Sequence, residues 1–372
     1  MAASIREHFS VVPDPRVDRT KLHNLEDILI LSICGVICGA DTWVDISEFG
    51  RSKEGFFRSF LELPNGIPSH DTFGRVFAAM DADAFERSFQ SWVKDLAGSS
   101  SGKLIALDGK AIRRSLDQAG GRAAIHMVSA WVYENHAVFG QLKVDDKSNE
   151  ITAIPKLLEM LDLKDATVTI DAIGCQRDIA GKILERGGQY VLAVKGNQGT
   201  LHEDVKLFLD DAVERGFKGL ESDGYEQMEK GHGRIETRRT WTTGQVEWVN
   251  KRHEWPGLKS IAVMDCQREI GTKTSMERRY FISSLPCKAA QRIAQVVRKH
   301  WRVENQLHWC LDVCFGEDDS RVRIGNAAEN LSRVRRIGLM LLKQDATTKI
   351  GIKAKRLKAG WDEAYLLKIL QL

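Results

Sequence analysis

The sequence predicts an α/β protein in which a mixed β-sheet is covered by helices. Three observations lead to this fold class. Between residues 103 and 200, short apolar runs alternate with segments of helical periodicity, as they do in sheets with crossing helices. Residues 1–98 contain helical spacing alone, which predicts a separate helical module. Residues 201–284 interrupt the alternation before a further helix at 293–315, which predicts an insertion.

Composition places the chain among ordinary globular proteins of the cytoplasm. Its 372 residues, 28% of them charged and 43% hydrophobic, are enough for one large domain or several smaller ones. The seven cysteines form no CxxC pair, and their placement on apolar faces indicates buried thiols in a reducing compartment. The longest apolar run, 28–40, is too short to cross a bilayer, and no signal peptide precedes it. We therefore expect a cytoplasmic protein with no membrane partner.

Positive charge is concentrated near the C-terminus. The net charge is only +3, yet nine Lys or Arg and a single acid lie between Arg333 and Lys358. We predict a catalytic region at 103–343 and a basic C-terminal tail at 344–372. Such a tail can follow DNA phosphates, or it can be a solvated helix with no partner. Both interpretations stay open at this stage.

The N-terminal module, residues 1–98, is predicted to contain four helical stretches. They are 22–40, 43–60, a helix capped by Ser69, and 85–96. The module carries no catalytic constellation, so it either binds DNA ends, mediates dimerisation or serves as a packing accessory. The segment 98–102, Gly-Ser-Ser-Ser-Gly, predicts a boundary after it.

The following region is predicted as three strands, a helix, a strand, a helix and a strand. A buried run at 104–107 is followed by a hairpin of 124–133 and 137–144. Helices at 151–161 and 177–186 flank a second buried strand at 166–170, and a third strand spans 189–194. The insertion begins with a helix at 201–214 and continues in short strand-like pieces. A last helix is predicted at 327–343.

Three acidic residues are the candidate catalytic site. Asp108 and Asp171 each follow a buried strand, and the carboxyl ends of strands are where open α/β sheets hold their ligands. Glu304 falls within the apolar stripe of the helix 293–315, where an unpaired charge would be costly. Three converging carboxylates require a cation, and hard oxygen ligands suit Mg²⁺ or Mn²⁺. Two such ions can activate a water or a 3′-hydroxyl against a phosphodiester.

Two alternatives compete with this interpretation of Glu304. A buried glutamate can simply be satisfied by an arginine or a backbone amide. The acidic cluster Glu317-Asp318-Asp319 is a second source of the third ligand, although its spacing is typical of a helix end.

Six motifs resemble the ISAs-type insertion-sequence transposases, which include the H-repeat-associated proteins linked to Rhs elements. The motifs are LDGK (107–110), KSNEI (147–151), TIDAIGCQ (169–176), VKGNQ (194–198), HGRIETR (232–238) and RKHWRVENQLHWCLDVCFGEDDSR (298–321). The resemblance implies an RNase H-like mixed sheet with flanking helices and an insertion before the last catalytic helix. It implies DDE chemistry by Asp108, Asp171 and Glu304, with two Mg²⁺ or Mn²⁺ ions. It also implies double-stranded DNA as partner, both element ends and target, and a homodimer in the synaptic complex.

The wider superfamily often carries Tyr-x2-Arg-x3-Glu-x6-Lys on its last helix. Here those positions hold Val297, His300, Glu304 and Leu311, so contacts to the terminal phosphates must come from other residues. The candidates share positive charge or family-like motifs: Lys110, Lys195, His232, Arg234, Arg238, Arg298, His300, Arg302, Arg333, Arg335 and Arg336. Three tryptophans of the insertion, 241, 248 and 255, either stack on an extruded base or pack in the core, and packing is favoured.

The expected function is therefore a metal-dependent transposase that cuts element ends and transfers the freed 3′ strand. Two alternatives remain at this stage. One is an RNase H-like nuclease without strand transfer, and the other is a catalytically silent DNA-binding relic of a transposable element.

Overall fold

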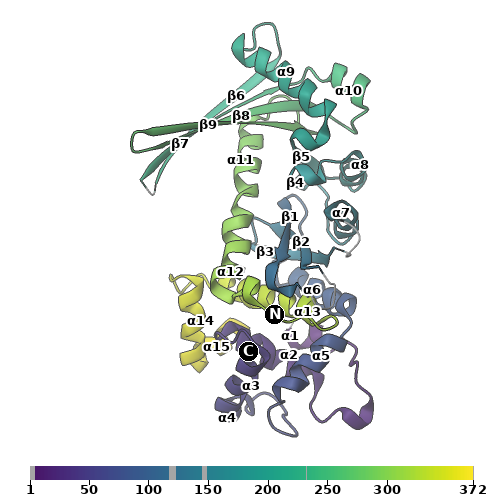
Figure 1. Ribbon diagram of the computed structural model, residues 1–372, viewed down its shortest axis with the longest axis vertical. Coiled ribbons are helices and arrows are strands. Elements are labelled where there is room, and N and C mark those ends of the chain that lie inside the picture. Colours follow the sequence, from purple (N-terminus) through teal and green to yellow (C-terminus); the bar gives the residue numbers. More distant parts are fainter. Residues whose placement is uncertain (1–4, 117–122, 145–148, 232, 372) are drawn as a thin grey trace.

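The computed structural model describes residues 5–116, 123–144, 149–231 and 233–371 (Figure 1). The molecule is elongated, with helices from both ends of the chain gathered at one end and a long sheet running away from them. None of the described helices combines the length and the apolar character that a bilayer crossing needs.

A single nine-stranded sheet forms the backbone of the molecule, in the order β3-β2-β1-β4-β5-β9-β8-β7-β6. Its first five strands are β1 (Leu104–Ile112), β2 (Ile125–Val132), β3 (Ala137–Lys143), β4 (Thr167–Ile170) and β5 (Gln189–Val194). β1, β4 and β5 are parallel, and β2 and β3 continue from β1 as an antiparallel meander. This is the RNase H-like arrangement, and it confirms the predicted α/β class.

Helices cover both faces of these five strands (Figure 1). α7 (Glu150–Glu159) contacts β2 and β3, and α8 (Arg177–Glu185) contacts β5. The long helix on the other face consists of α11 (Ala290–His300), the π turn η5 (Glu304–His308) and α12 (Trp309–Phe315). α11 contacts β1, β4 and β5.

The insertion extends the same sheet and does not form a separate unit. Its elements are α9 (Thr200–Glu214), β6 (Ser222–Gly231), β7 (Arg234–Thr243), α10 (Glu247–His253), β8 (Ser260–Ile270) and β9 (Lys273–Ser283). β9 pairs antiparallel with β5, so the hydrogen-bonded ladder is continuous from the catalytic strands into the insertion. The short pieces expected here are in fact strands of 10 or 11 residues. The outer halves of β8 and β9 are exposed or half-exposed on both faces and therefore lack an alternating apolar pattern.

The three tryptophans of the insertion pack against its helices and strands. Trp255 is buried, Trp241 stacks on Phe217 with ring centroids 6.4 Å apart, and Trp248 lies 5.2 Å from Phe208. Packing therefore accounts for all three side chains.

The N-terminal module is helical throughout. Its helices are α1 (Ile5–Phe9), α2 (Leu25–Ile37), α3 (Trp43–Ser52), α4 (Glu54–Phe57), α5 (His70–Ala79) and α6 (Ala82–Ala97). The helix expected at 43–60 is two helices, because the backbone of Lys53 leaves the helical region between them. α13 (Ala327–Gln344) lies among α2, α5 and α6, so the last long helix of the chain is part of the core of the first module.

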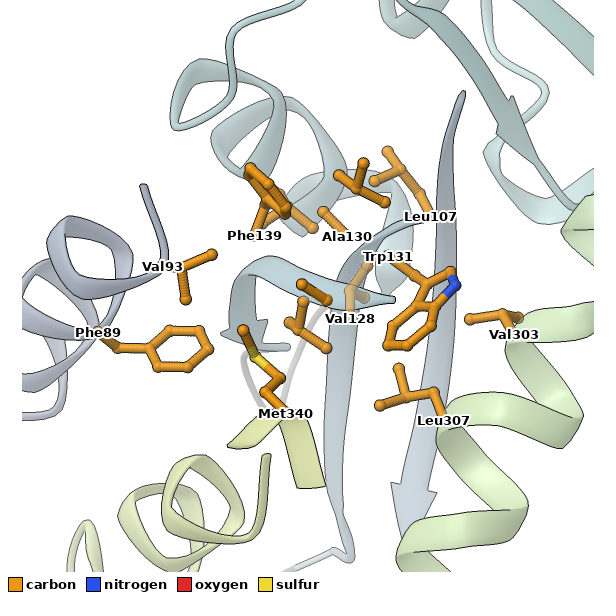
Figure 2. Close-up of a cluster of buried hydrophobic side chains, with 14 of the residues drawn as sticks. Phe89, Val93, Leu107, Val128, Ala130, Trp131, Phe139, Val303, Leu307 and Met340 are labelled. Atoms are coloured by element: carbon orange, nitrogen blue, oxygen red, sulfur yellow. The ribbon is translucent and has the colours of Figure 1, made fainter. Parts of the chain in front are cut away.

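One apolar core joins the sheet, the catalytic helix and the N-terminal module (Figure 2). Trp131 of β2 is fully buried at its centre. Val303 and Leu307 approach it from the helix, while Met340 of α13 and Phe89 of α6 close the other side. A large aromatic side chain at such a junction fixes the distance between the elements, because protein interiors tolerate few voids.

The arginines of α13 are buried, which corrects the expectation that they contact DNA. Arg333 donates to Glu86 (2.6 Å) and Glu329 (2.7 Å), and Arg336 pairs with Glu317 at 2.9 Å. Arg335 is 2% exposed. Arg333 and Arg336 are paired with carboxylates inside the protein, Arg335 donates to the backbone carbonyl of Asp41 (3.4 Å), and burial closes all three to a phosphate. The sequence alone could not show this, because Glu86 lies 247 residues from Arg333 and Glu317 lies beyond the preceding loop.

The basic C-terminal segment is a pair of packed helices, α14 (Ile352–Trp361) and α15 (Glu363–Leu370). Arg356 is buried and donates to the Val36 carbonyl (3.0 and 2.8 Å) and to the Asp41 carboxylate (2.8 Å). Its guanidinium also lies over the ring of Phe315. Arg356 thus holds α14 against α2 and α12 and does not contact solvent as a tail would.

The loop before α13 is fastened to the end of α5. The Asn326 amide donates to the Ala78 carbonyl (3.0 Å), and the Asn330 side chain donates to the carbonyls of Phe77 and Met80 (3.0 Å each). Gly325 has φ +52° and passes so close to the Ala78 carbonyl that a Cβ atom would overlap it. Only glycine meets both conditions without strain.

We expect Gly325→Ala to lower the free energy of unfolding by about 1–3 kcal/mol, because it adds backbone overlap to an unfavourable φ. Thermal unfolding followed by circular dichroism measures the loss. Gly219→Ala is the matched control, since Gly219 has φ +79° but no heavy atom within 4 Å of a Cβ. An equal loss in the two variants would show that the close approach costs nothing.

Candidate active site

Two aspartates lie side by side on neighbouring parallel strands. Leu107 of β1 is paired with Ile170, the last residue of β4. The residues that follow them in the chain, Asp108 and Asp171, are therefore adjacent. Neighbouring strands are separated by about 4.8 Å, which places both carboxylates within reach of one ligand. β4 ends before Asp171, as expected. β1 does not end at Asp108 but continues to Ile112, paired with β2.

Asp171 is held in its ionised form. Its carboxylate accepts hydrogen bonds from the Ala172 amide (2.7 Å) and the Lys195 ammonium (3.0 Å). Burial would raise the pKa of Asp171, but these two donors outweigh burial and hold the pKa below its usual range. Lys195 thus lies at the site as predicted, and it is neutralised there by a carboxylate.

Two histidines of the catalytic helix face the aspartates. His308 Nε2 lies 3.0 Å from an Asp108 carboxylate oxygen. Burial lowers the pKa of His300, while the nearby carboxylates of Asp108 and Asp171 oppose that shift. His300, expected as a phosphate contact, is thus a half-buried neighbour of the aspartates and lines a cleft with Asp171. His308 was not predicted, although its spacing of eight residues from His300 places the two on one helix face.

The expected position of Glu304 is wrong. Glu304 is exposed, and so is Trp301, although helical spacing from Val297 predicts an inward position for Trp301 as well. The inward positions are taken by Val303 and Leu307 (Figure 2). α11 ends at His300 with a turn at Trp301, and the π turn Glu304–His308 follows, so regular 3.6-residue periodicity is interrupted where Trp301 and Glu304 lie.

The three acids do not converge in the structure. Among the residues that the structure describes, no group of three His, Cys, Asp or Glu side chains is close enough to hold a metal ion. Asp108 and Asp171 are brought together, while Glu304 lines a neighbouring cleft.

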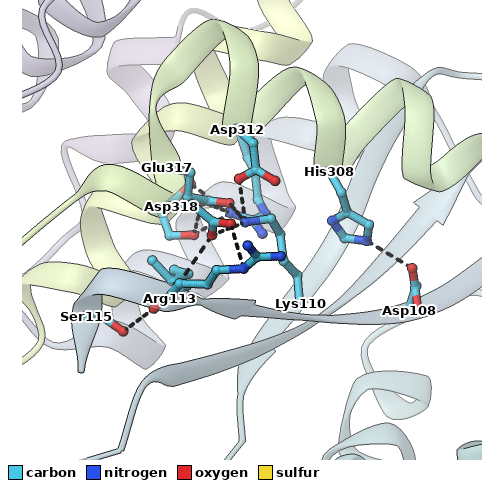
Figure 3. A network of polar contacts seen from close by, with 11 residues as sticks. Asp108, Lys110, Arg113, Ser115, His308, Asp312, Glu317 and Asp318 are labelled. Atoms are coloured by element: carbon cyan, nitrogen blue, oxygen red, sulfur yellow. Dashed lines mark hydrogen bonds and ion pairs between the residues drawn. The ribbon is translucent and has the colours of Figure 1, made fainter.

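Lys110 is the centre of a buried ion-pair network (Figure 3). Its ammonium lies 2.6 Å from Asp312, 2.8 Å from Asp318 and 3.5 Å from Glu317. The side chain is 8% exposed, so the expectation that Lys110 binds DNA phosphate is wrong. Its partners neutralise it inside the protein.

The acidic cluster after α12 is part of this network and is not a set of metal ligands. Glu317 is fully buried, and burial would raise its pKa. The charges of Arg336, Lys110 and Arg335 outweigh that effect and hold the pKa of Glu317 at about 2. Asp108 and Lys110 lie two apart on β1, and their partners His308 and Asp312 lie four apart on the helix. Residues two apart on a strand share a face, as do residues four apart on a helix, so the two pairs join β1 to the helix side by side.

The remaining predicted cations surround the cleft that Glu304 lines, between the insertion and the catalytic helix. Arg234 pairs with Glu236 (2.9 Å), Arg238 with Glu229 (2.8 Å) and Glu236, and Arg298 with Glu229 (2.9 Å). The charged side chains lining the cleft are Arg234, Glu236, Arg238, Arg268, Glu277, Arg279, Arg298 and Glu304. Arg302 lies elsewhere, over the Tyr133 ring and bonded to its hydroxyl. His232 lies outside the described residues.

A sheet of this topology, with two aspartates on adjacent strands, is the arrangement of the DDE enzymes. The chain belongs to the Transposase DDE domain family, whose pattern matches residues 99–341, and residues 6–93 match the DDE_Tnp_1-associated family. The predicted resemblance is thereby confirmed, and the chain is a DDE transposase by family.

Several relatives are similar over nearly their whole length. The H repeat-associated putative transposase YhhI of Escherichia coli K12 is 42% identical, over 98% of this chain and 97% of its own. The putative transposase YncI of Escherichia coli O157:H7 is also 42% identical, over 99% and 94%. A solved piggyBac transposase synaptic complex with hairpin DNA aligns with all of this chain and 77% of its own, at 9% identity and a TM-score of 0.43.

We expect Glu317→Gln to lower the free energy of unfolding at pH 7 by about 3–5 kcal/mol, because it leaves buried cations without their counter-charge. A carboxyl whose pKa falls on folding stabilises the fold above its unfolded value of 4.5 and loses that effect as the pH drops towards 2. The native protein should therefore lose more stability than the variant between pH 5 and pH 2.5. Urea unfolding monitored by tryptophan fluorescence gives both quantities.

Asp319→Asn is the control for this experiment. Asp319 belongs to the same cluster, but its side chain is 76% exposed and its pair with Arg114 spans 3.4 Å. Such a surface pair contributes about 0–1 kcal/mol. Similar losses in the two variants would contradict a special role for the buried carboxylate.

Proposed function

We propose that this transposase cuts DNA at the ends of an insertion sequence and joins the freed 3′ ends to target DNA. The observation that supports the proposal best is the adjacency of Asp108 and Asp171 on parallel strands, next to the cation-lined cleft. Family membership supplies the reaction class. Duplex DNA is the proposed partner, both as element ends and as target, and a homodimer pairing two ends belongs to the same proposal.

The donor set fits a divalent metal ion. Asp108 and Asp171 offer carboxylate oxygens, which Mg²⁺ and Mn²⁺ prefer. Glu304 makes no ion pair with any residue that the structure describes, and it is exposed in the adjoining cleft, so its carboxylate is available. We propose that these three residues hold the metal, two ions in the working enzyme. When bound, such ions lower the pKa of a coordinated water and neutralise charge on the phosphate.

The chain's own residues position the DNA. Lys195 and His300 surround Asp171, and Arg234, Arg238 and Arg298 line the cleft beside Glu304. In the cleavage step, water supplies a new oxygen to phosphorus and the bond to the 3′ oxygen breaks. In strand transfer, that 3′-hydroxyl loses its proton and attacks a target phosphorus, which releases a 3′-hydroxyl of the target strand. Phosphoryl transfer of this kind depends mainly on positioning and charge neutralisation.

We expect Asp108→Asn, Asp171→Asn and Glu304→Gln each to reduce cleavage of a supercoiled plasmid carrying the DNA borders of the gene to background, with Mg²⁺ or Mn²⁺ present. Each change keeps the shape of the side chain and removes one negative charge. Gel electrophoresis of nicked and linear products measures the loss. Asp211→Asn is the matched control, because Asp211 pairs with Arg215 on exposed α9.

Full activity in either aspartate variant would overturn the carboxylate site. Loss with the aspartates alone, and native activity in Glu304→Gln, would remove Glu304 from the metal ligands.

A catalytically silent DNA-binding relic is the second candidate, and one observation favours it: Glu304 is not grouped with the aspartates. A strand-transfer assay on pre-cleaved duplexes with free 3′-hydroxyls separates the possibilities. Joined products support the transposase, cleavage without joining supports a nuclease, and binding without either reaction supports the relic.

A further inference from the structure

A groove lies between α5 and the loop that precedes α13, away from the aspartates. α5 contributes His70, Asp71, Gly74, Arg75, Ala78 and Ala79, and the loop contributes residues 321–325. Trp43 forms part of the wall and packs on Phe77 with ring centroids 4.8 Å apart. The groove therefore joins the N-terminal module to the region that follows the catalytic helix.

The lining of the groove is mainly apolar, and its charged side chains are predominantly cationic. Arg75, Arg321 and Arg323 are exposed and line it. Within the described parts of the chain, none of the three has a carboxylate at ion-pair distance: Arg75 donates to the backbone carbonyl of Asp71, and Arg323 to that of Arg114. The one acid of the groove, Asp71, faces His70 at 3.5 Å. The arginines of α13 and of the cleft beside Glu304, by contrast, are largely neutralised by glutamates.

The groove is also preformed. Gly325, Asn326 and Asn330 fasten the loop to the carbonyl end of α5, so its two walls cannot move independently. Two hydrogen bonds to the Arg114 carbonyl, 3.2 and 3.1 Å long, fix the guanidinium of Arg323. Beside Arg75, the residues of α5 that line the groove are Gly74, Ala78 and Ala79. Their small side chains leave room for the backbone of a nucleic acid to approach. A preorganised set of cations loses little entropy on binding.

The groove is connected to the active site through β1. Beyond Asp108, β1 continues to Ile112. Arg113 and Arg114 follow, and their side chains are 84% and 55% exposed. The Arg114 carbonyl is the acceptor for Arg323. Five residues of strand span about 17 Å, the length of about five base pairs of duplex. A duplex engaged at the aspartates would therefore reach the groove within about one helical turn.

We propose that this groove binds the phosphodiester backbone of duplex DNA, using Arg75, Arg321 and Arg323. The proposal rests on the proposed function, since it takes the duplex at the active site as the DNA that continues into the groove. It gives residues 1–98 a direct share in DNA binding. Contacts of this kind position a duplex without reading its sequence.

The test is salt-dependent binding of a fluorescein-labelled duplex from the DNA borders of the gene, by fluorescence anisotropy without added metal. The variants are the triple changes Arg75→Gln/Arg321→Gln/Arg323→Gln and Arg75→Lys/Arg321→Lys/Arg323→Lys. Each phosphate contact contributes about 0.9 to the slope of log K against log salt. The Gln variant should therefore lose about 2–3 from the slope and bind at least about tenfold more weakly at low salt, while the Lys variant should keep most of the slope.

Arg215→Gln is the control, because Arg215 is exposed just after α9, and α9 lies at the opposite end of the molecule from α5 (Figure 1). Thermal unfolding verifies that the triple variants are folded. A native slope and native affinity in a folded Gln variant would overturn the groove while leaving the active site untouched. Cleavage is measured in parallel. If the aspartate variants lose metal-dependent cleavage while the Gln variant keeps the native slope, the groove fails and the proposed function stands. Native protein that binds no duplex would overturn both.

Discussion

The buried carboxylate of Glu317 is the interaction on which the arrangement of the molecule depends. It lies just beyond the catalytic helix and receives Lys110 from β1 and Arg336 from α13. A buried ion pair contributes little net stability compared with apolar packing, but it is costly to break and it accepts only one geometry. Glu317 therefore sets how strand, helix and N-terminal module meet, and Asp108 lies two residues from Lys110 within that junction.

The same logic extends along α13. Arg333 reaches Glu86 of α6, and the apolar face of α13 packs against α2 and α5. The N-terminal module and the catalytic sheet thus share one continuous core, centred on Trp131 and on α13 (Figure 2). The geometry of the groove between α5 and the 321–325 loop follows from this shared core, because both of its walls are attached to α13.

The sequence was sufficient for the order of strands along the chain and for the adjacency of Asp108 and Asp171, because two buried runs that are each followed by an acid place the acids at the same level when the strands pair in parallel. It was insufficient for Glu304, because helical periodicity assumes 3.6 residues per turn and the π turn breaks that rule. It was also insufficient for Lys110, Arg333 and Arg336. Long cationic side chains count as surface residues unless their acidic partners are known, and those partners are distant in sequence. The full length of β8 and β9 was missed because their outer halves are exposed or half-exposed on both faces and show no apolar alternation.

The continuity of the sheet from β3 to β6 has a geometrical consequence. Adjacent strands are rotated by about 20–25° relative to each other, so a rotation accumulates across the nine strands. In Figure 1 the strands of the insertion accordingly cross the direction of β1, and their hairpins extend past α11. The twist of the sheet thus places the strands of the insertion, with their arginines, across the helix formed by α11 and α12. No hinge is required for this placement. Through the β9–β5 and β5–β4 pairings, the hydrogen bonds of the insertion are continuous with the strands that carry the aspartates.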